Sequence, residues 1–316
     1  MSKNQPLVSV ICLCHNQKKF VRQSIKSVFD QSYGNIELIV VDDGSTDGSK
    51  DEIRSLLSKH EDVRFIDIRD NIGNTSAFNK GFSESNGQFI IDLAADDILL
   101  NNRIEKQVDF FQTCDDSTGV IYSDAQYINE SGEILNTHFA INRYHPHEGD
   151  IYKELIRHFF IPPPTMMIKK AVFDELNGYD ESLAYEDFDF WVRSSRNWKY
   201  AFQHEVLTKI TKHRNSLSNF WYTKGDEQLY STYKVCKKIR RLNRNDAEHK
   251  ALLARVKFEI RQAVFSANHR EAELFIRLLI ELGGINWIYH FLKFLNWFQV
   301  DLSSMRKLYH SIKYGV

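Results

Sequence analysis

The first 111 residues alternate between short apolar runs and segments whose apolar side chains recur at helical spacing. The runs are rich in valine and isoleucine and short, which is typical of buried strands in a parallel sheet. They cover residues 8–13, 36–41, 63–68 and 89–93. Between the first two runs, Phe20, Ile25, Val28 and Phe29 fall on one face of a helix. Such alternation with short links predicts an α/β fold with a doubly wound, mostly parallel sheet.

The pattern changes in the second half of the chain. Short strand-like runs near residue 125 are followed by Asn129-Glu-Ser-Gly132, which is typical of a hairpin turn. From residue 227 onward the apolar spacing is helical throughout, without a single proline. We therefore expect an α/β domain over residues 1–222 and an all-helical region over residues 223–316.

Composition adds a charge asymmetry to this picture. The 316 residues are 42% hydrophobic and 26% charged, with a net charge of −1. Residues 226–316 nevertheless hold 16 Lys and Arg against 9 Asp and Glu. An acidic body with a basic tail predicts two different partner surfaces. No apolar stretch approaches the roughly 18 residues of a spanning helix, and the polar start of the chain predicts no signal peptide. We expect a cytoplasmic protein with reduced thiols.

Two pairs of acids stand where predicted strands end. Asp42-Asp43 follows the second apolar run, and Asp96-Asp97 follows the fourth. The carboxyl ends of parallel strands form the ligand-binding edge of an α/β sheet. Adjacent carboxylates repel each other, so they suit a cation or a ligand that donates hydrogen bonds. The pattern predicts a phosphate ligand bridged by a metal. The alternative for the first pair is a plain turn that caps a helix.

Familiar nucleotide motifs are missing from the sequence. No Gly-x-Gly-x-x-Gly follows the first run, and no Gly-x-x-x-x-Gly-Lys-Ser/Thr occurs. These absences argue against a dinucleotide-dependent dehydrogenase and a P-loop NTPase. The acidic body also argues against nucleic acid as a partner.

Five motifs, in order, resemble those of the family 2 glycosyltransferases, which have the GT-A fold. They occupy residues 8–16, 37–47, 71–81, 87–97 and 178–193. The resemblance implies an inverting hexosyltransferase that moves a sugar from a nucleotide-diphospho-sugar to a hydroxyl acceptor. It favours a UDP-sugar donor, a saccharide or lipid-linked acceptor, and Mn2+ or Mg2+ as cofactor. A role in bacterial surface polysaccharide or cell-envelope glycan synthesis would follow.

The same resemblance assigns donor-binding residues. Asn16 ends the first motif, and Asn74 and Asn79 belong to the third. Asp43 could accept a hydrogen bond from the ring N–H of uracil or thymine. We expect Asp97 to bind the metal and Asp96 to face the ribose or to support the loop.

Two departures from the family pattern affect the donor site. Ala94 stands where the family often has an aspartate, and Leu13-Cys14-His15 replaces a common Pro-Thr-Tyr. The first shortens the acidic motif, and the second changes the contacts expected around the nucleotide base.

A third acidic pair, Glu186-Asp187, fits the catalytic-base motif. Inverting transfer needs one base that removes the proton of the acceptor hydroxyl. By resemblance Asp187 is that base, and Glu186 orients the acceptor. Asp189 points about 200° away on the same helix, which predicts a structural role. The alternative for the pair is a solvated acidic helix start.

His213 resembles a histidine of the family that meets the metal or the diphosphate. A lone histidine is also often structural, so both interpretations stand. An imidazole beside a carboxylate would suit manganese at least as well as magnesium.

Two other functions compete with this prediction. The alanine at position 94 would fit a catalytically silent sugar-nucleotide-binding or scaffold subunit. A nucleotidyltransferase would need a glycine-rich loop after the first strand, but residues 14–19 contain no glycine.

The helical tail carries a segment dense in aromatic residues, 285–298. Aromatic side chains favour boundaries between apolar and wet surroundings. The tail is therefore expected to meet a membrane surface. The alternative is that these aromatic side chains pack onto the α/β domain or onto a second subunit of a homodimer.

Overall fold

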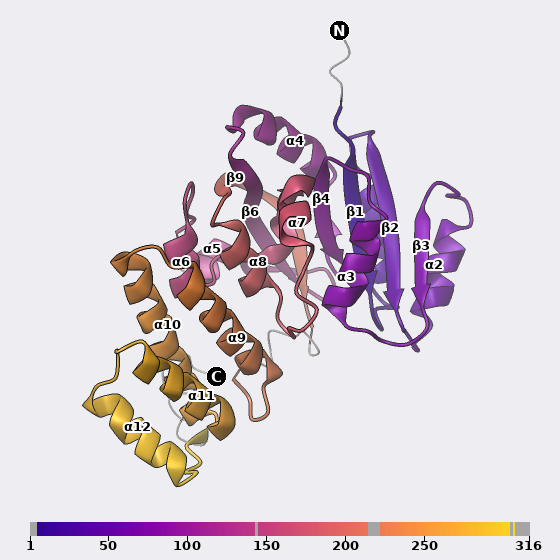
Figure 1. The fold of residues 1–316 in the computed structure, drawn as a ribbon. Coiled ribbons are helices and arrows are strands. Elements are labelled where there is room, and N and C mark those ends of the chain that lie inside the picture. The colour runs from indigo at the N-terminus through magenta and orange to yellow at the C-terminus, as the bar shows by residue number, and fades with distance from the viewer. Residues whose placement is uncertain (1–4, 143–144, 214–221, 304–305, 307–316) are drawn as a thin grey trace. The chain divides into compact units, whose positions relative to one another are not determined.

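The computed structural model describes residues 5–142, 145–213, 222–303 and 306 (Figure 1). The chain divides into two compact units. The first comprises residues 1–151, 160–182 and 193–213, and the second comprises residues 152–159, 183–192 and 214–316. The expected domain boundary between residues 222 and 223 stays a prediction.

The first unit is built on one sheet, in which the described residues form nine strands. The strands are β1 (Val8–Cys14), β2 (Ile36–Asp43), β3 (Arg64–Ile68), β4 (Phe89–Ala94), β5 (Ile98–Leu99), β6 (Thr118–Asn129), β7 (Ile134–Thr137), β8 (Met167–Lys169) and β9 (Lys199–Lys212). Their order is β3-β2-β1-β4-β8-β6-β9-β5, with β7 paired to β6. The first four strands are mutually parallel, as are β6 and β9. The predicted α/β, mostly parallel sheet is confirmed.

The central strands end at the same level. Cys14 at the end of β1 pairs with Asp42 of β2, and Leu13 pairs with Ala94 at the end of β4. The residues that follow these strands therefore emerge at one edge of the sheet, which is the edge where α/β proteins bind ligands.

Helices of the first unit bury apolar faces against this sheet. They are α1 (Val21–Phe29), α2 (Ser49–Leu57), α3 (Asn74–Ser83), α4 (Arg103–Thr113), α5 (His138–Asn142), the 3-10 turn η1 (Pro163–Thr165) and α7 (Lys170–Leu176). In α1, Val21, Ile25 and Val28 enter one core cluster with strand residues such as Val10 and Val40. The helical spacing read from the sequence thus forms the contact with the sheet.

The second unit is helical. It contains α6 (Tyr152–Arg157), α8 (Asp187–Ser194, whose last two residues group with the first unit), α9 (Glu227–Leu242), α10 (Asp246–Phe265), α11 (His269–Glu281) and α12 (Trp287–Trp297). Asp226, Asn245 and Asn286 each cap the helix that follows by accepting a backbone N–H. The predicted helical C-terminal region is confirmed. None of the described helices combines the length and the apolar character that crossing a bilayer requires.

Candidate active site

Asp43, at the end of β2, holds the loop that follows β3. Its side chain is buried, with Oδ1 accepting the Ile72 N–H at 2.8 Å and Oδ2 accepting the Gly73 N–H at 3.0 Å. Gly44 lets this loop approach, since a Cβ there would lie 2.5 Å from the Asn71 backbone nitrogen. Each carboxylate oxygen keeps a further lone pair. Asp43 can therefore position the loop and still accept one hydrogen bond from a ligand.

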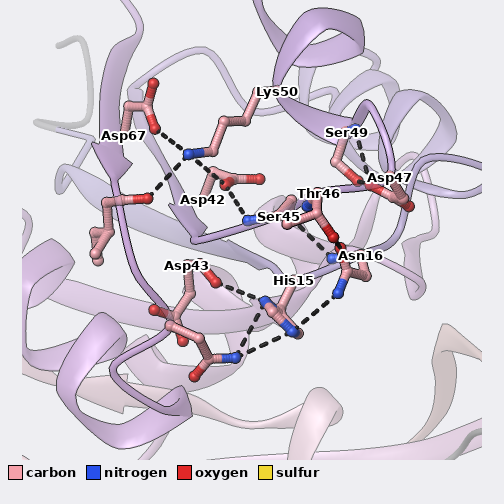
Figure 2. A network of polar contacts seen from close by, with 12 residues as sticks. His15, Asn16, Asp42, Asp43, Ser45, Thr46, Asp47, Ser49, Lys50 and Asp67 are labelled. Carbon is pink, nitrogen blue, oxygen red and sulfur yellow. Dashed lines mark hydrogen bonds and ion pairs between the residues drawn. The ribbon is translucent and has the colours of Figure 1, made fainter.

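His15 joins the ends of β1 and β2 to the same loop (Figure 2). Its Nδ1 lies 2.5 Å from the Asp43 carbonyl oxygen. Its Nε2 lies 3.0 Å from each of the side-chain amides of Asn16 and Asn71. The Nδ1-protonated tautomer satisfies these contacts, because Nδ1–H donates to the carbonyl and Nε2 accepts from the amides. His15 thus connects the exposed loops at this edge of the sheet. It stands at the position where the family described above often has a tyrosine.

Asn16 connects the loop after β1 to the loop after β2. Its Oδ1 accepts the Thr46 N–H at 2.8 Å, and its own N–H donates to Ser45 Oγ at 2.9 Å. It adopts a left-handed backbone conformation with φ of 55°, which asparagine tolerates better than most residues. Asn16 therefore lies at the predicted edge, as an exposed residue tied to both loops.

Asp42 points into the protein instead. It is fully buried, its Oδ1 accepts the Ser45 N–H at 2.9 Å, and Lys50 Nζ lies 3.7 Å away. Lys50 also pairs with Asp67 at 2.7 Å. The alternative that Asp42-Asp43 forms a plain turn thus describes the contacts of Asp42. Asp43 faces the loop after β3.

The two remaining asparagines of the donor prediction lie on α3. Asn74 is the first residue of this helix and is exposed. Asn79 instead makes three hydrogen bonds to residues 179–181: Nδ2 donates to the Tyr179 carbonyl and to Glu181 Oε1, and Oδ1 accepts the Tyr179 N–H. Its contacts therefore fix the loop after α7, and donor binding by Asn79 stays a prediction.

Asp96 and His213 meet just beyond the end of β4. Asp96 Oδ2 lies 2.9 Å from His213 Nε2, and their side chains are 15% and 10% exposed. The His213 ring stacks on Phe20 with centroids 5.5 Å apart. Thr211 Oγ1 donates to the Asp96 carbonyl at 2.5 Å. The pair is partly open to solvent and is fixed from both sides.

Asp97 is buried and turns the other way. Its Oδ1 accepts the Thr211 N–H at 3.0 Å. Burial and the neighbouring Asp96 charge raise the pKa of the Asp97 carboxyl well above its ordinary value. The sequence-based assignment placed the metal at Asp97 and gave Asp96 the supporting role. That assignment stays a prediction, and the contact of Asp96 with His213 makes Asp96 an alternative metal ligand.

Sequence reasoning missed Arg103, a fully buried residue at the start of α4. Its guanidinium donates to the carbonyls of Pro164 at 2.7 Å and Met166 at 3.0 Å, and to Thr208 Oγ1 at 2.9 Å. Burial lowers the pKa of Arg103 to about 9, although the Asp97 charge acts against this. Arg103 thus holds the proline turn against the sheet. An arginine at a helix start gives no sequence signal for such a role.

The side chains of Asp96 and His213 at the sheet edge fit a divalent cation that also binds a diphosphate. The described residues contain no group of three or more His, Cys, Asp or Glu side chains placed to hold a metal ion. Asp96 and His213 supply one carboxylate and one imidazole, which are donors that Mn2+ accepts. Two protein ligands would leave coordination positions for diphosphate oxygens.

In the second unit, Glu186 and Asp187 begin α8. Asp187 is its first residue, the Glu186 carbonyl accepts the Phe190 N–H at 2.9 Å, and both side chains are half-buried. Asp189 is buried and pairs with Lys238 at 2.6 Å. Its contacts therefore agree with the structural role predicted from helical spacing.

The helical region supports this acidic segment from within the second unit. Ser231 Oγ of α9 accepts the Ala184 N–H at 2.8 Å. The Arg255 guanidinium of α10 lies 4.1 Å from the Phe159 ring centroid and 5.3 Å from that of Phe188. Residues far apart in the sequence thus hold the segment that carries Glu186 and Asp187, a dependence that no local motif indicates.

The fold is that of known glycosyltransferases. Staphylococcus aureus TarS (residues 1–349, in complex with UDP-GlcNAc) matches with a TM-score of 0.69 at 15% identity, over 98% of this chain and 92% of that one. The mannosyltransferase PcManGT from Pyrobaculum calidifontis, in complex with GDP-Man and Mn2+, matches with a TM-score of 0.60 at 13% identity, over 97% and 88%. These similarities define the GT-A fold expected from the motifs.

Sequence comparison then identifies the family. The model of glycosyl transferase family 2 matches residues 9–176, and the chain belongs to this family. A glycosyltransferase of Rickettsia prowazekii is 32% identical over 215 residues, which cover 68% of this chain and 66% of that protein. One of Methanocaldococcus jannaschii is 31% identical over 240 residues, covering 73% and 78%. The family membership predicted from the five motifs is confirmed.

Proposed function

We propose that this chain is an inverting, metal-dependent glycosyltransferase that moves a sugar from a nucleotide-diphospho-sugar to a hydroxyl acceptor. One observation carries the proposal. Asp96 follows β4 and contacts His213, which follows β9, and Asp43 ends β2 and binds the loop after β3. The strands β1, β2 and β4 end together at this edge of the sheet. A metal-binding pair near a polar loop suits a diphosphate joined to a nucleoside.

The donor we favour is a UDP-sugar. TarS and PcManGT were solved with UDP-GlcNAc and GDP-Man, which supports a nucleotide-sugar of either base. Asp43 already accepts one hydrogen bond at each oxygen. It can still accept the single ring N–H of uracil. Asn16 and Asn74 are exposed near this edge and are the further donor contacts we propose.

Asp96 and His213 are the residues we propose as metal ligands. Mn2+ or Mg2+ bound with the diphosphate would neutralise the charge that develops on the leaving nucleoside diphosphate. The protein's part is to present one carboxylate and one imidazole in fixed positions, which Thr211 and Phe20 secure. Asp97 supports this arrangement from the interior.

Asp187 is the base we propose. The acceptor oxygen attacks the anomeric carbon from the side opposite the diphosphate, so the new carbon–oxygen bond forms as the bond to phosphate breaks. The hydroxyl proton passes to the Asp187 carboxylate. A single displacement of this kind inverts the anomeric configuration. Glu186 would orient an acceptor that is a saccharide or a lipid-linked saccharide, in keeping with cell-envelope glycan synthesis.

A silent sugar-nucleotide-binding subunit is the second candidate, and Ala94 favours it because the family often has an acid there. The two functions differ in turnover and not in donor binding. Release of nucleoside diphosphate from UDP-, GDP- and dTDP-sugars, measured with Mn2+ and with EDTA, therefore distinguishes them.

Asp187→Asn sharpens this experiment. The variant should bind UDP as the wild type does and lose transfer by about 10²–10⁴-fold, the usual contribution of a general base. Asp174→Asn is the matched control, since it removes a surface carboxylate that pairs with Lys170 and should leave turnover unchanged. Donor binding without turnover in the wild type would favour the silent subunit. Turnover retained by Asp187→Asn would assign the base elsewhere.

A further inference from the structure

Helix α12 exposes a row of large aromatic side chains. Trp287 and Trp297, near its two ends, are 77% and 76% exposed, and Phe291, Phe294 and Phe298 between and beside them are 53–57% exposed. We call these five residues the aromatic face. Successive residues turn by about 100° on a helix, which places all five on one broad side. An apolar patch of this kind on a protein surface marks an interaction site.

The opposite side of α12 packs against the rest of the helical unit. Tyr289, Leu292 and Asn296 are its buried residues. The Asn296 side chain makes two contacts with His269. Its Oδ1 lies 2.9 Å from His269 Nδ1, and its Nδ2 donates to the His269 carbonyl at 2.9 Å. The helix is thus fixed by Tyr289 and Leu292 in the core of the helical unit and by the contacts of Asn296 with His269, and its aromatic face is turned outward. Figure 1 shows α12 running beside α11 at the yellow end of the helical unit.

Positive charge lies on α12, beside the aromatic face at Lys293, and on the neighbouring helix α10, against the buried side of α12. Residues 285–298 contain no Asp or Glu, and Lys293 of α12 is exposed. On α10, Arg261 donates to the Tyr289 hydroxyl at 2.6 Å, and Lys257 Nζ lies 5.7 Å from the Tyr289 ring. Lys250 extends the same row two turns earlier. Exposed aromatic side chains beside a lysine, in a segment without acidic residues, match the headgroup region of an anionic bilayer, where apolar and negatively charged groups meet.

We propose that the aromatic face docks the protein on an anionic membrane surface, with α12 lying in the plane of the bilayer. Eleven residues give a helix about 16 Å long, against a hydrocarbon core of about 30 Å, so α12 lies on the membrane instead of crossing it. Trp287 and Trp297 anchor its two ends at the depth that indole rings prefer.

A second copy of the chain is a weaker match for this face. Five aromatic side chains of about 200 Å² each, little more than half exposed, offer roughly 600 Å². A stable protein interface buries about 800 Å² on each partner. Two copies facing each other through α12 would also bring two exposed Lys293 side chains into one interface, which is unfavourable.

Vesicle co-flotation of the full chain tests the proposal without any sugar donor. The vesicles are phosphatidylcholine alone and phosphatidylcholine with about one third phosphatidylglycerol. The wild type should bind the anionic vesicles at least about tenfold more tightly than the neutral ones, and added salt should weaken this binding. Because no transfer is measured, failure here leaves the proposed reaction untouched.

Substitutions on the aromatic face locate the binding. Trp287→Ser/Phe291→Ser/Phe294→Ser should reduce partitioning to anionic vesicles by at least about tenfold, since much of the inserted apolar area is lost. Ile134→Ser/Leu135→Ser is the matched control, because these residues of β7 are 59% and 52% exposed. The control should bind vesicles as the wild type does, and unchanged thermal unfolding checks that both variants are folded.

Three results would overturn the proposal. The first is no binding of the wild type to anionic vesicles at low salt. The second is equal loss of binding in the β7 control. The third is a wild-type dimer in light scattering that the α12 variant converts to a monomer, which would assign the face to a second copy.

Discussion

The two aspartate pairs at the sheet edge have the same arrangement of one inward and one outward carboxylate. They differ in the charges that surround the inward carboxylate. In each pair one carboxylate turns inward and accepts a backbone N–H, from Ser45 at Asp42 and from Thr211 at Asp97. The other turns toward the ligand edge, where Asp43 binds loop amides and Asp96 binds His213. The inward Asp42 has Lys50 beside it, whereas burial and Asp96 raise the pKa of Asp97.

In the first pair the residue that faces the ligand edge is the second one, Asp43. In the second pair it is the first one, Asp96. Asp42 and Asp43 are the last residues of β2, where neighbouring side chains point to opposite sides. Asp96 and Asp97 instead lie in the segment between β4 and β5, which begins as a turn. Which acid faces outward depends on how the chain leaves the strand. Roles assigned to one pair therefore do not transfer by position to the other.

The largest effect should come from Asp43→Asn. One oxygen can still accept a loop amide, but the new NH2 group faces a second N–H donor, at Gly73 or Ile72. Loss of a hydrogen bond to a charged acceptor costs about 1.5–3 kcal/mol. We expect UDP binding, measured by calorimetry, to weaken by about 10- to 100-fold. Unchanged affinity would remove Asp43 and its loop from the donor site.

A smaller effect on stability should follow Lys50→Met. This change leaves the fully buried Asp42 without its nearest cation. Lys50 is itself partly exposed, so water reduces the loss, and we expect about 1–2 kcal/mol from urea unfolding. Lys170→Met, which removes a surface pair with Asp174, should stay within about 0.5 kcal/mol. Equal losses in the two variants would mean that Asp42 does not depend on Lys50.

The smallest effect should come from His213→Ala. It removes one of two proposed metal ligands and leaves Asp96 in place. UDP binding with Mn2+ should weaken by about tenfold, the usual range for one altered metal contact, while binding in EDTA stays constant. His204→Ala, at an exposed position, is the control. A uniform loss with and without Mn2+ would assign His213 a structural role.

Local patterns predicted the parts of the fold that depend on neighbouring residues. Apolar runs located β1 to β4 and therefore both acid pairs, and helical spacing placed Asp189 away from the predicted base. Contacts between distant segments left no such pattern. Asn79 belongs to a donor motif but bonds to residues 179–181, and Arg103 fixes a proline turn some 60 positions later. The same limit applies to the acid pair after β4, because the contact between Asp96 and His213 joins positions 117 residues apart.

The segment around Glu186 and Asp187 shows this limit most clearly. Its motif, residues 178–193, is local, yet its support comes from Ser231 and Arg255 in the helical region. A sequence boundary near residue 222 separates the motif from these contacts. We therefore expect full-length protein to be needed for any test of Asp187.

Calorimetric titration of UDP into Asp96→Asn and Asp97→Asn, each with Mn2+ and with EDTA, tests the central claim most directly. Wild type should bind at least about tenfold more tightly with Mn2+. Asp96→Asn should lose this difference. Asp97→Asn should keep it, because asparagine can still accept the Thr211 N–H, and its unfolding temperature checks the fold. A metal effect that survives in Asp96→Asn and disappears in a folded Asp97→Asn would contradict the account.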